Sequence, residues 1–289
     1  MANEVYRFSI NDKISADRGM FSVVNELIDH FYVGDLNGYK IKPRWKKSPY
    51  KSVEHGDDVF SYYFEPLYTP NANDEEIGRV KKHARRKGNL ITPTETGYLD
   101  QPKSREVLQK IIEKYIKLKK HITEKINDFE KNNFKDNKIL GVHLRGGGIL
   151  TGTYHPLNSD NVDEKKKQKI ALKNGVPYEL FFEEIDKYLN DNKDASIFLC
   201  SDSEDVIQQC KNKYEDKIIT YDSTRTNVGE MHHDVSLQNM KYKLGEDILI
   251  EAYLLSKTDY LIHGSSNVTN FVLCNNSKLE NHFVYSAII

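Results

Sequence analysis

Three short segments in the second half of the chain place polar residues directly after an apolar run. In the first, the mainly apolar run 139–144 contains His143 near its end, and Arg145 and three consecutive glycines follow it. An arginine offers a planar fork of donors that matches a phosphate, and consecutive glycines let backbone N–H groups approach an anion closely. The spacing fits neither a Walker A loop nor a dinucleotide fingerprint. The pattern predicts another kind of anion site, with a surface salt bridge of Arg145 and a plain glycine turn as the structural alternative.

The other two segments end in groups that cap helices or bind anions. Asp202 follows the apolar run 196–200, and Gly264–Asn267, which contains Ser265 and Ser266, follows the run 260–263. A helix start offers free N–H groups and a favourable dipole to a phosphate. Helix capping, by Ser203 and by Ser266, is the structural alternative. A cationic fork and a helix start at one sheet edge together favour a nucleoside diphosphate as the ligand.

Two further groups of residues carry titratable side chains. Asp247 falls at the expected start of a helix over 245–257, where the helix dipole alone explains an acid. The stretch Glu230–Asp234 contains adjacent histidines, His232 and His233. Neighbouring residues point in different directions on a strand or a helix, and the i, i+4 spacing of a helical metal site is absent. We expect a substrate-side loop there and no metal.

The order of the expected elements indicates how these segments are positioned. In the second half, expected strands alternate with expected helices, which implies a parallel sheet covered on both faces. The strands are at 139–144, 196–200, 217–221, 260–263 and 282–285, and the helices at 178–189, 203–214, 245–257 and 266–274. Residues 157–176 are expected to form a solvated loop. Since parallel strands end at one edge, that edge is the expected binding site.

The first half lacks this alternation. Residues 21–32 have the apolar spacing of a helix, and the aromatic, proline-interrupted segment 39–64 favours short elements and loops. Apolar residues recur every three or four positions over 102–134, which predicts one continuous helix. We therefore expect two domains, an N-terminal α/β domain at 1–135 that ends in this helix and a C-terminal nucleotide-binding domain at 136–289.

Composition narrows the class of protein. The 289 residues include 42 Lys and Arg against 43 Asp and Glu, a net charge of −1, so we expect no nucleic-acid partner. No apolar run is long enough for an integral membrane segment, and no signal peptide is evident at the start. The cysteines, Cys200, Cys210 and Cys274, are expected to be buried and reduced, which indicates a cytoplasmic protein and leaves peripheral membrane docking open. The basic run 79–87 is interpreted as a solvated, charged helix, with local attraction for an acidic acceptor as the alternative.

Four segments resemble motifs of the fucosyltransferase superfamily, which includes the α1,6-fucosyltransferases, the rhizobial nodulation fucosyltransferase and the protein O-fucosyltransferases. His143-Leu144-Arg145 resembles its His-x-Arg motif, and 197–203 its strand ending in Ser-Asp. The long segment 247–267 is similar to a third motif, and 19–25 to an N-terminal glycine-rich turn. The resemblance covers most of 139–275 and, more faintly, 18–66.

The resemblance implies an α/β, GT-B-like fold with two Rossmann-like halves facing a cleft. It implies a GDP-sugar substrate, typically GDP-fucose, and neither a metal nor another cofactor. By position, Arg145 would hold the β-phosphate, Ser265 or Ser266 the diphosphate, and His143 and Asp247 the guanine. The remaining donor-side positions would be Gly146, Gly147 and Asp202, and the N-terminal turn would contribute Gly19 and Asn25. The chain departs from the α1,6 enzymes where Gly146–Gly148 replaces Arg-Thr-Asp, which removes an arginine and an acid.

The function that follows is an inverting glycosyltransferase that transfers fucose from GDP-fucose to an oligosaccharide or other glycan acceptor. Arg145 would stabilise the leaving diphosphate, and His155 is the preferred general base over His232, His233 and Glu230. Three alternatives stay open. These are the same fold with another nucleotide-sugar donor, a metal-dependent hydrolase using His143, His232, His233 and Asp234, and an inactive nucleotide-sugar-binding module.

Overall fold

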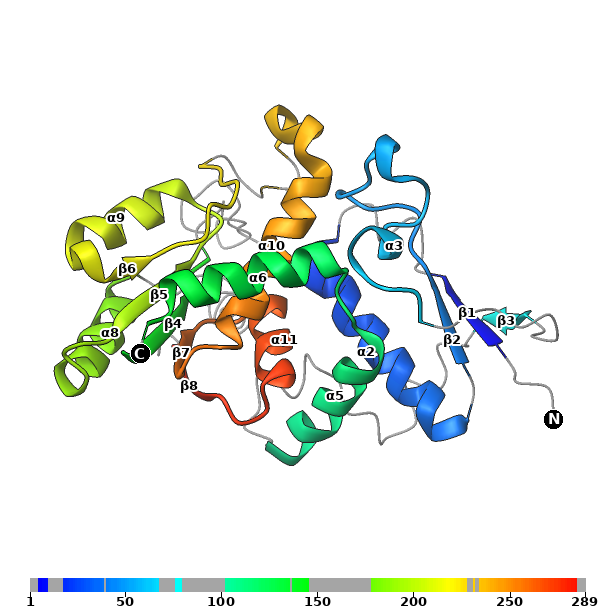
Figure 1. The fold of residues 1–289 in the computed structure, drawn as a ribbon, viewed down its shortest axis with the longest axis horizontal. Helices are drawn as coiled ribbons and strands as arrows, with labels where there is room; N and C mark the ends of the chain where they lie inside the picture. Colours follow the sequence, from blue (N-terminus) through cyan, green and yellow to red (C-terminus); the bar gives the residue numbers. More distant parts are fainter. Residues whose placement is uncertain are drawn as a thin grey trace, which may run out of the picture.

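The computed structural model describes residues 5–9, 18–38, 40–67, 76–79, 102–135, 137–145, 178–227, 231 and 234–284. Two parallel sheets organise them (Figure 1). The first half contains β1 Val5–Ser9, α2 Met20–Asn37, β2 Lys40–Arg44, η1 Val53–His55, α3 Phe60–Tyr63, β3 Glu76–Arg79, α5 Pro102–Tyr115 and α6 Lys120–Asn133. Its three strands pair in the order β2-β1-β3.

The second half alternates strands and helices as expected. Its elements are β4 Ile139–His143, α8 Tyr178–Asp191, β5 Ser196–Cys200, α9 Glu204–Tyr214, η4 Glu215–Lys217, β6 Ile218–Ile219, η6 Val235–Met240, α10 Lys241–Leu255, β7 Tyr260–His263, α11 Asn267–Asn275 and β8 Glu280–Phe283. The five strands are parallel, in the order β6-β5-β4-β7-β8. β4 is the first strand of this sheet in the sequence. β5 and β6 then add on one side of it, and β7 and β8 add on the other. The strand order therefore reverses at β4, the position where α/β sheets bind ligands.

Alternation along the strands assigns the helices to the two faces of this sheet. Ile197 and Leu199 pack with α8 and α9, whereas Phe198 and Cys200 belong to the core beneath α6, α10 and α11. The expected sheet with both faces covered is thus confirmed. Gly141 of β4 lets α10 approach closely, since a Cβ there would lie 2.6 Å from Thr258 Oγ1 and 3.2 Å from Leu255 Cδ2.

The two halves share one hydrophobic core. α2 lies between the two sheets in Figure 1 and packs against β2, α5 and α11. The Phe21 and Phe271 rings lie 4.6 Å apart, and Asn25 Nδ2 donates to the carbonyl of Asn267 at 2.9 Å. The expected boundary at residue 135 falls between α6 and β4, and the division into two domains stays a prediction.

The expected single helix over 102–134 is wrong, because α5 and α6 are separated at 116–119. There the chain is extended: Glu65 N donates to Lys117 O at 2.8 Å, and Lys119 N donates to Tyr63 O at 2.9 Å. Leu118 forms a bridge with Phe64. Ile112 and Ile122 are both buried, so the apolar spacing continues across the break and hides it.

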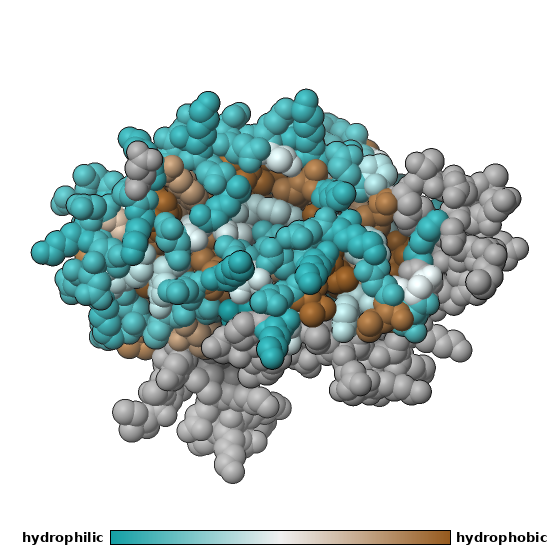
Figure 2. All heavy atoms as spheres, turned by 60° about the horizontal axis from the view of Figure 1, so that its bottom comes forward, coloured by the Kyte–Doolittle hydropathy of each residue, from teal (hydrophilic) through white to brown (hydrophobic). Residues whose placement is uncertain are grey.

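Smaller differences occur at other ends. α2 continues five residues beyond the expected end at Tyr32, and the last strand lies at 280–283 instead of 282–285. The three cysteines are free and buried, as predicted. Figure 2 shows one face of the molecule, on which hydrophilic side chains cover most of the described surface and hydrophobic ones show between them.

Candidate active site

The register of the larger sheet brings the three predicted strand ends together. His143 of β4 pairs in register with Cys200 of β5 on one side and with His263 of β7 on the other. The residues that follow these strands therefore leave the sheet at one edge. Arg145, Asp202 and the Gly264–Asn267 segment, far apart in sequence, become neighbours at this edge.

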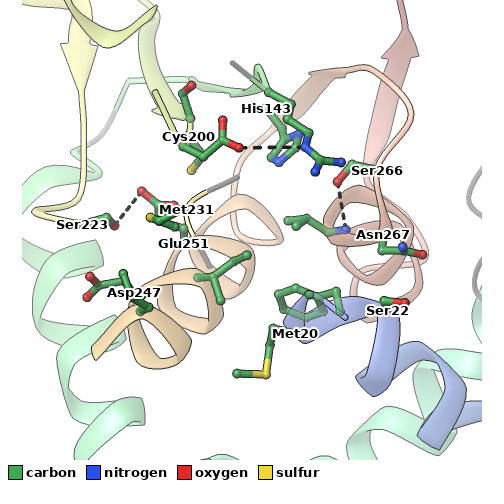
Figure 3. A pocket seen from close by; sticks show the side chains of 18 of the residues that line it. Met20, Ser22, His143, Cys200, Ser223, Met231, Asp247, Glu251, Ser266 and Asn267 are labelled. Carbon is green, nitrogen blue, oxygen red and sulfur yellow. Dashed lines mark hydrogen bonds and ion pairs between the residues drawn. The ribbon is translucent and has the colours of Figure 1, made fainter. Parts of the chain in front are cut away.

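A pocket of about 330 Å³ opens at this edge and is lined by both halves of the chain (Figure 3). The start of α2 contributes Gly19, Met20 and Ser22, and the loop after β6 contributes Ser223 and Thr224. Six of the residues predicted from the sequence line the pocket: Gly19, His143, Arg145, Asp202, Asp247 and Ser266.

The end of β4 supplies one neutral and one charged group. Burial lowers the pKa of His143 to about 4, so its imidazole is uncharged at neutral pH and can donate or accept a hydrogen bond. The side chain of Arg145 is 40% exposed, with Nε 3.9 Å from Asp202 Oδ2. The guanidinium carries several N–H donors and is half exposed, so a ligand in the pocket can reach it.

The start of α11 supplies backbone donors. Ser266 accepts from the N–H of Val268 at 3.2 Å and so caps the helix, as one of the two alternatives predicted. Ser266, Asn267 and Val268 line the pocket, whereas Ser265 does not. Ser203 likewise caps α9, accepting from Val206 N at 3.4 Å. The cap does not exclude anion binding, because it satisfies only one of the free N–H groups of the first turn.

Two acids on α10 line the same pocket, one turn apart. Asp247 Oδ2 accepts from Thr224 N at 2.9 Å and from Lys243 Nζ at 2.6 Å. Glu251 Oε1 accepts from Ser223 Oγ at 2.7 Å and lies 3.5 Å from an Arg225 nitrogen. Burial raises the pKa of Glu251 to about 7. These acids therefore hold the loop after β6 while presenting carboxylate oxygens to the pocket.

The explanation of Asp247 by a helix start is wrong. α10 begins at Lys241, preceded by the 3₁₀ turn η6, so Asp247 lies in its second turn and is 2% exposed. Asp234, whose carboxylate accepts from Ser236 N at 2.9 Å, caps η6, and α10 follows η6 directly, so it starts at Lys241, four residues earlier than expected. The hydrogen bonds that Asp247 accepts from Thr224 and Lys243, not the helix dipole, account for an acid at this position.

Sequence reasoning missed several lining residues, including Arg18, Tyr50, Ser223, Thr224 and Glu251. Glu251 was detectable, because it lies four residues after Asp247 on an expected helix and so shares its face. Nothing in the sequence marked the loop residues, which follow a strand of only two residues.

Other predicted residues are not placed in the pocket. Gly146, Gly147 and His155 lie outside the described residues, as do Glu230, His232 and His233. Asn25 does not line the pocket but bonds to Asn267, which does.

Neither a metal site nor a membrane span is found in the part of the chain that the structure describes. No group of three His, Cys, Asp or Glu residues there is placed to hold a metal. Both carboxylate oxygens of Asp234 accept hydrogen bonds, from Ser236 and from Thr226. None of the described helices is long and apolar enough to cross a membrane.

A parallel sheet with a pocket at its carboxyl edge, closed by a second α/β half, is the arrangement of GT-B glycosyltransferases. The nodulation protein Z (NodZ) family matches residues 98–272, more than half of the chain, and the chain belongs to this family. The resemblance to the fucosyltransferase superfamily, the GT-B-like α/β fold and the assignment as a glycosyltransferase are confirmed.

Solved structures support the fold. NodZ α-1,6-fucosyltransferase co-crystallised with GDP is 16% identical, with 94% of this chain and 92% of that chain covered and a TM-score of 0.53. Fucosyltransferase NodZ from Bradyrhizobium is 17% identical, with the same coverage and TM-score. POFUT1 in complex with GDP is 12% identical, with 98% of both chains covered and a TM-score of 0.54. No curated protein matches the chain by sequence.

Proposed function

We propose that this protein transfers fucose from GDP-fucose to a hydroxyl group of a glycan acceptor, with inversion at the anomeric carbon and without a metal or other cofactor. The observation that carries the proposal is a single pocket that combines Arg145 and the start of α11 with the two acids of α10. In the view of Figure 3, His143 and Ser266 lie on one side of the pocket and Asp247 and Ser223 on the other. The first side of such a pocket can bind a diphosphate, and the second can bind a nucleobase.

The diphosphate side accounts for catalysis of the transfer. When the acceptor hydroxyl attacks the anomeric carbon, the bond to the β-phosphate breaks and negative charge grows on the leaving GDP. Arg145 and the N–H groups of the first turn of α11 stabilise that charge more in the transition state than in the ground state. Asp202, 3.9 Å from Arg145 Nε, orients the guanidinium.

The α10 side accounts for recognition of guanine. A carboxylate accepts two hydrogen bonds from the guanine N1–H and exocyclic amine, which uracil and cytosine cannot offer in the same pattern. We assign this role to Asp247, with Glu251 one turn away as the second candidate. His143, uncharged at neutral pH, contributes a hydrogen bond on the nucleotide without adding charge.

The proposal extends to the general base, for which His155 is our candidate. Replacement by Ala or Gln should lower kcat by about 10²–10⁴-fold and remove the acidic limb of the pH–rate profile. A loss below about tenfold with that limb intact would move the role to the stretch 230–234 or to the leaving diphosphate. His233→Ala, measured in parallel, tests that stretch: it should leave kcat and the acidic limb nearly unchanged if His155 is the base, and lower kcat if the role lies at 230–234.

The similar structures give the proposal its choice of donor. A NodZ α-1,6-fucosyltransferase has been crystallised with GDP and soaked with GDP-fucose, and POFUT1 has been crystallised with GDP-fucose. With the pocket described above, these complexes favour GDP-fucose over other nucleotide sugars.

Thermal unfolding with nucleotides tests the donor. A ligand present at a hundred times its Kd stabilises the folded state by about 2.7 kcal/mol, so GDP should raise Tm clearly and UDP, ADP and CMP little. Equal shifts for GDP and UDP would contradict the guanine assignment. NMR of a product made from GDP-fucose should show the anomeric configuration opposite to that of the donor. GDP binding without any turnover would indicate the inactive binding module instead.

A further inference from the structure

A short segment of the N-terminal half concentrates positive charge. Residues 40–51 contain six Lys or Arg and no acid, in a chain whose net charge is −1. The segment comprises β2, the outer strand in the order β2-β1-β3, and the turn that follows it. In register with it, Lys42 pairs with Arg7 of β1, which pairs with Arg79 of β3. The basic residues are therefore not evenly distributed over the molecule.

Packing directs the apolar residues of this segment inward and leaves its cations outward. Ile41 is 3% exposed and Trp45 fully buried, while the intervening Lys42 is exposed. We call four of these cations the cationic strip: Lys42, Arg44, Lys46 and Lys47. They form no hydrogen bond or ion pair with any other described residue, whereas Lys51 pairs with Asp57 at 2.9 Å and is left out.

Two acids, Asp57 and Asp58, act on the strip through space but do not neutralise it. Lys51, through its hydrogen bond, and more weakly Lys46 lower the pKa of Asp57. Arg44 and Lys46 lower the pKa of Asp58, yet burial outweighs them and raises it overall. The Oδ1 atom of Asp58 accepts from the backbone N–H groups of Trp45, at 3.0 Å, and Phe60, at 3.3 Å. This carboxylate is committed to the backbone, so the four cations stay available to a ligand.

The strip leads toward the pocket. Tyr50, three residues beyond Lys47, lines the pocket, and its hydroxyl accepts from Met20 N at 3.1 Å. A strand rises about 3.3 Å per residue, so Lys42 and Arg44 of β2 follow one another at a spacing of roughly 7 Å, and Lys46 and Lys47 continue the segment beyond the strand. A polymer whose end reaches the pocket would pass over these cations.

We infer that the cationic strip binds the acceptor, and that the acceptor is an anionic polysaccharide with carboxylate or phosphate groups along its chain. This inference rests on the proposed function and specifies its acceptor. Separate cations along a line match repeated charges on a polymer. A membrane surface also attracts cations, but inserted apolar side chains make such docking stable, and the described residues expose only two large hydrophobic side chains, Leu36 and Val53, which are not adjacent in sequence.

The test uses fluorescence anisotropy, at two salt concentrations, to compare how the protein binds two labelled polysaccharides: anionic polygalacturonate and neutral dextran. Wild type should bind polygalacturonate more tightly than dextran, and binding should weaken with salt. The variant K42Q/R44Q/K46Q/K47Q should lose at least tenfold in affinity and much of the salt dependence. A matched variant neutralises four exposed lysines on or beside helices, K103Q/K110Q/K117Q/K211Q, and should bind polygalacturonate as wild type does.

Three outcomes would overturn the inference: no preference for polygalacturonate in wild type, equal losses in both variants, or binding only to vesicles containing phosphatidylglycerol. The GDP-induced shift in Tm, measured on the same samples, separates the two proposals. If GDP shifts Tm in wild type and in both variants while polygalacturonate fails to bind, the acceptor inference alone is wrong. If GDP does not shift Tm in wild type, the proposed function is wrong.

Discussion

The two sides of the pocket are built in different ways. On the side of Arg145 and Ser266, each group directly follows a strand, and its position is set by backbone register and a helix cap. On the side of Asp247 and Glu251, the groups are fixed by side-chain bonds between a helix and an irregular loop. The sheet therefore sets the geometry of the first side, whereas a network of buried polar contacts sets the geometry of the second.

This difference has a physical consequence for substitutions. A group that only extends from a strand end can be removed with little effect on the fold. A carboxylate that also holds a loop cannot, because its partners lose their hydrogen bonds with it. Binding and stability should therefore separate at Arg145, which extends from a strand end without capping a helix, and be coupled at the acids of the second side.

The largest effect is expected from Arg145 on the first side. Arg145→Ala should lower kcat by about 10²–10³-fold, as removal of an oxyanion donor does. The unfolding free energy should change by less than about 0.5 kcal/mol, because the side chain is 40% exposed. Steady-state kinetics and urea unfolding measure the two effects. Arg145→Lys should also be slow, and near-normal turnover in that variant would contradict a bidentate role.

Gly245 tests how tightly the second side is supported. A Cβ at Gly245 would overlap the Tyr63 hydroxyl and lie 2.8 Å from Met20 Cε, so Gly245→Ala should destabilise the protein by about 1–3 kcal/mol. Tyr63→Phe, added to Gly245→Ala, should recover part of this loss by removing the overlapping oxygen. The four unfolding free energies form a double-mutant cycle, and strictly additive costs would show that the overlap is relieved elsewhere.

Glu251 links the second side to pH. Its pKa is raised to about 7 in the folded protein from an ordinary value of 4.5, so the folded state binds the extra proton between these values. Stability contributed by the protonated carboxyl is therefore lost as pH rises from about 4.5 to 7. Over this range the unfolding free energy of wild type should fall by about 2–3 kcal/mol relative to that of Glu251→Gln.

Wild type has to be compared with Glu251→Gln because two histidines change the unfolding free energy with pH in the opposite direction. The pKa values of His143 and His263 are lowered to about 4, so their contribution to stability rises with pH between about 4 and 6.5. Both histidines are present in wild type and in the variant, so subtraction removes them. A difference that does not vary with pH would mean that Glu251 has the same pKa in the folded and the unfolded protein.

The smallest expected effect distinguishes the role of a serine in helix capping from a role in GDP binding. Ser266→Ala and Ser203→Ala each remove a helix cap and should each cost about 1 kcal/mol of stability. Only Ser266 lines the pocket, so only its replacement should weaken GDP binding, by several-fold in a calorimetric titration. Equal GDP affinities in the two variants would restrict Ser266 to its structural role.

The same difference explains how much could be predicted. His143, Asp202 and Ser266 were found from sequence because an apolar run marks a strand, and parallel strands end at a common edge. Ser223 and Thr224 could not be found, because a loop that follows a two-residue strand carries no periodicity. Glu251 could have been predicted, because it lies four residues after Asp247 on an expected helix, but its contact with Ser223 could not.

The error over residues 102–134 has the same origin. Helical periodicity reports which side chains are buried, and both α5 and α6 bury theirs in one core. It does not report backbone hydrogen bonds, so the pairing of Lys117 and Lys119 with residues 63–65 left no trace in the pattern. Tertiary partners decided where the helix ends.

The hydrogen bond from Asn25 to Asn267 joins residues 242 positions apart. During synthesis, the apolar face of α2 is therefore made long before its partner in α11. The pocket cannot be complete until α11 has left the ribosome, and contacts of such sequence separation slow folding. Nascent chains that stop before α11 would expose the Phe21 face of α2, and we expect them to depend on chaperones or to aggregate.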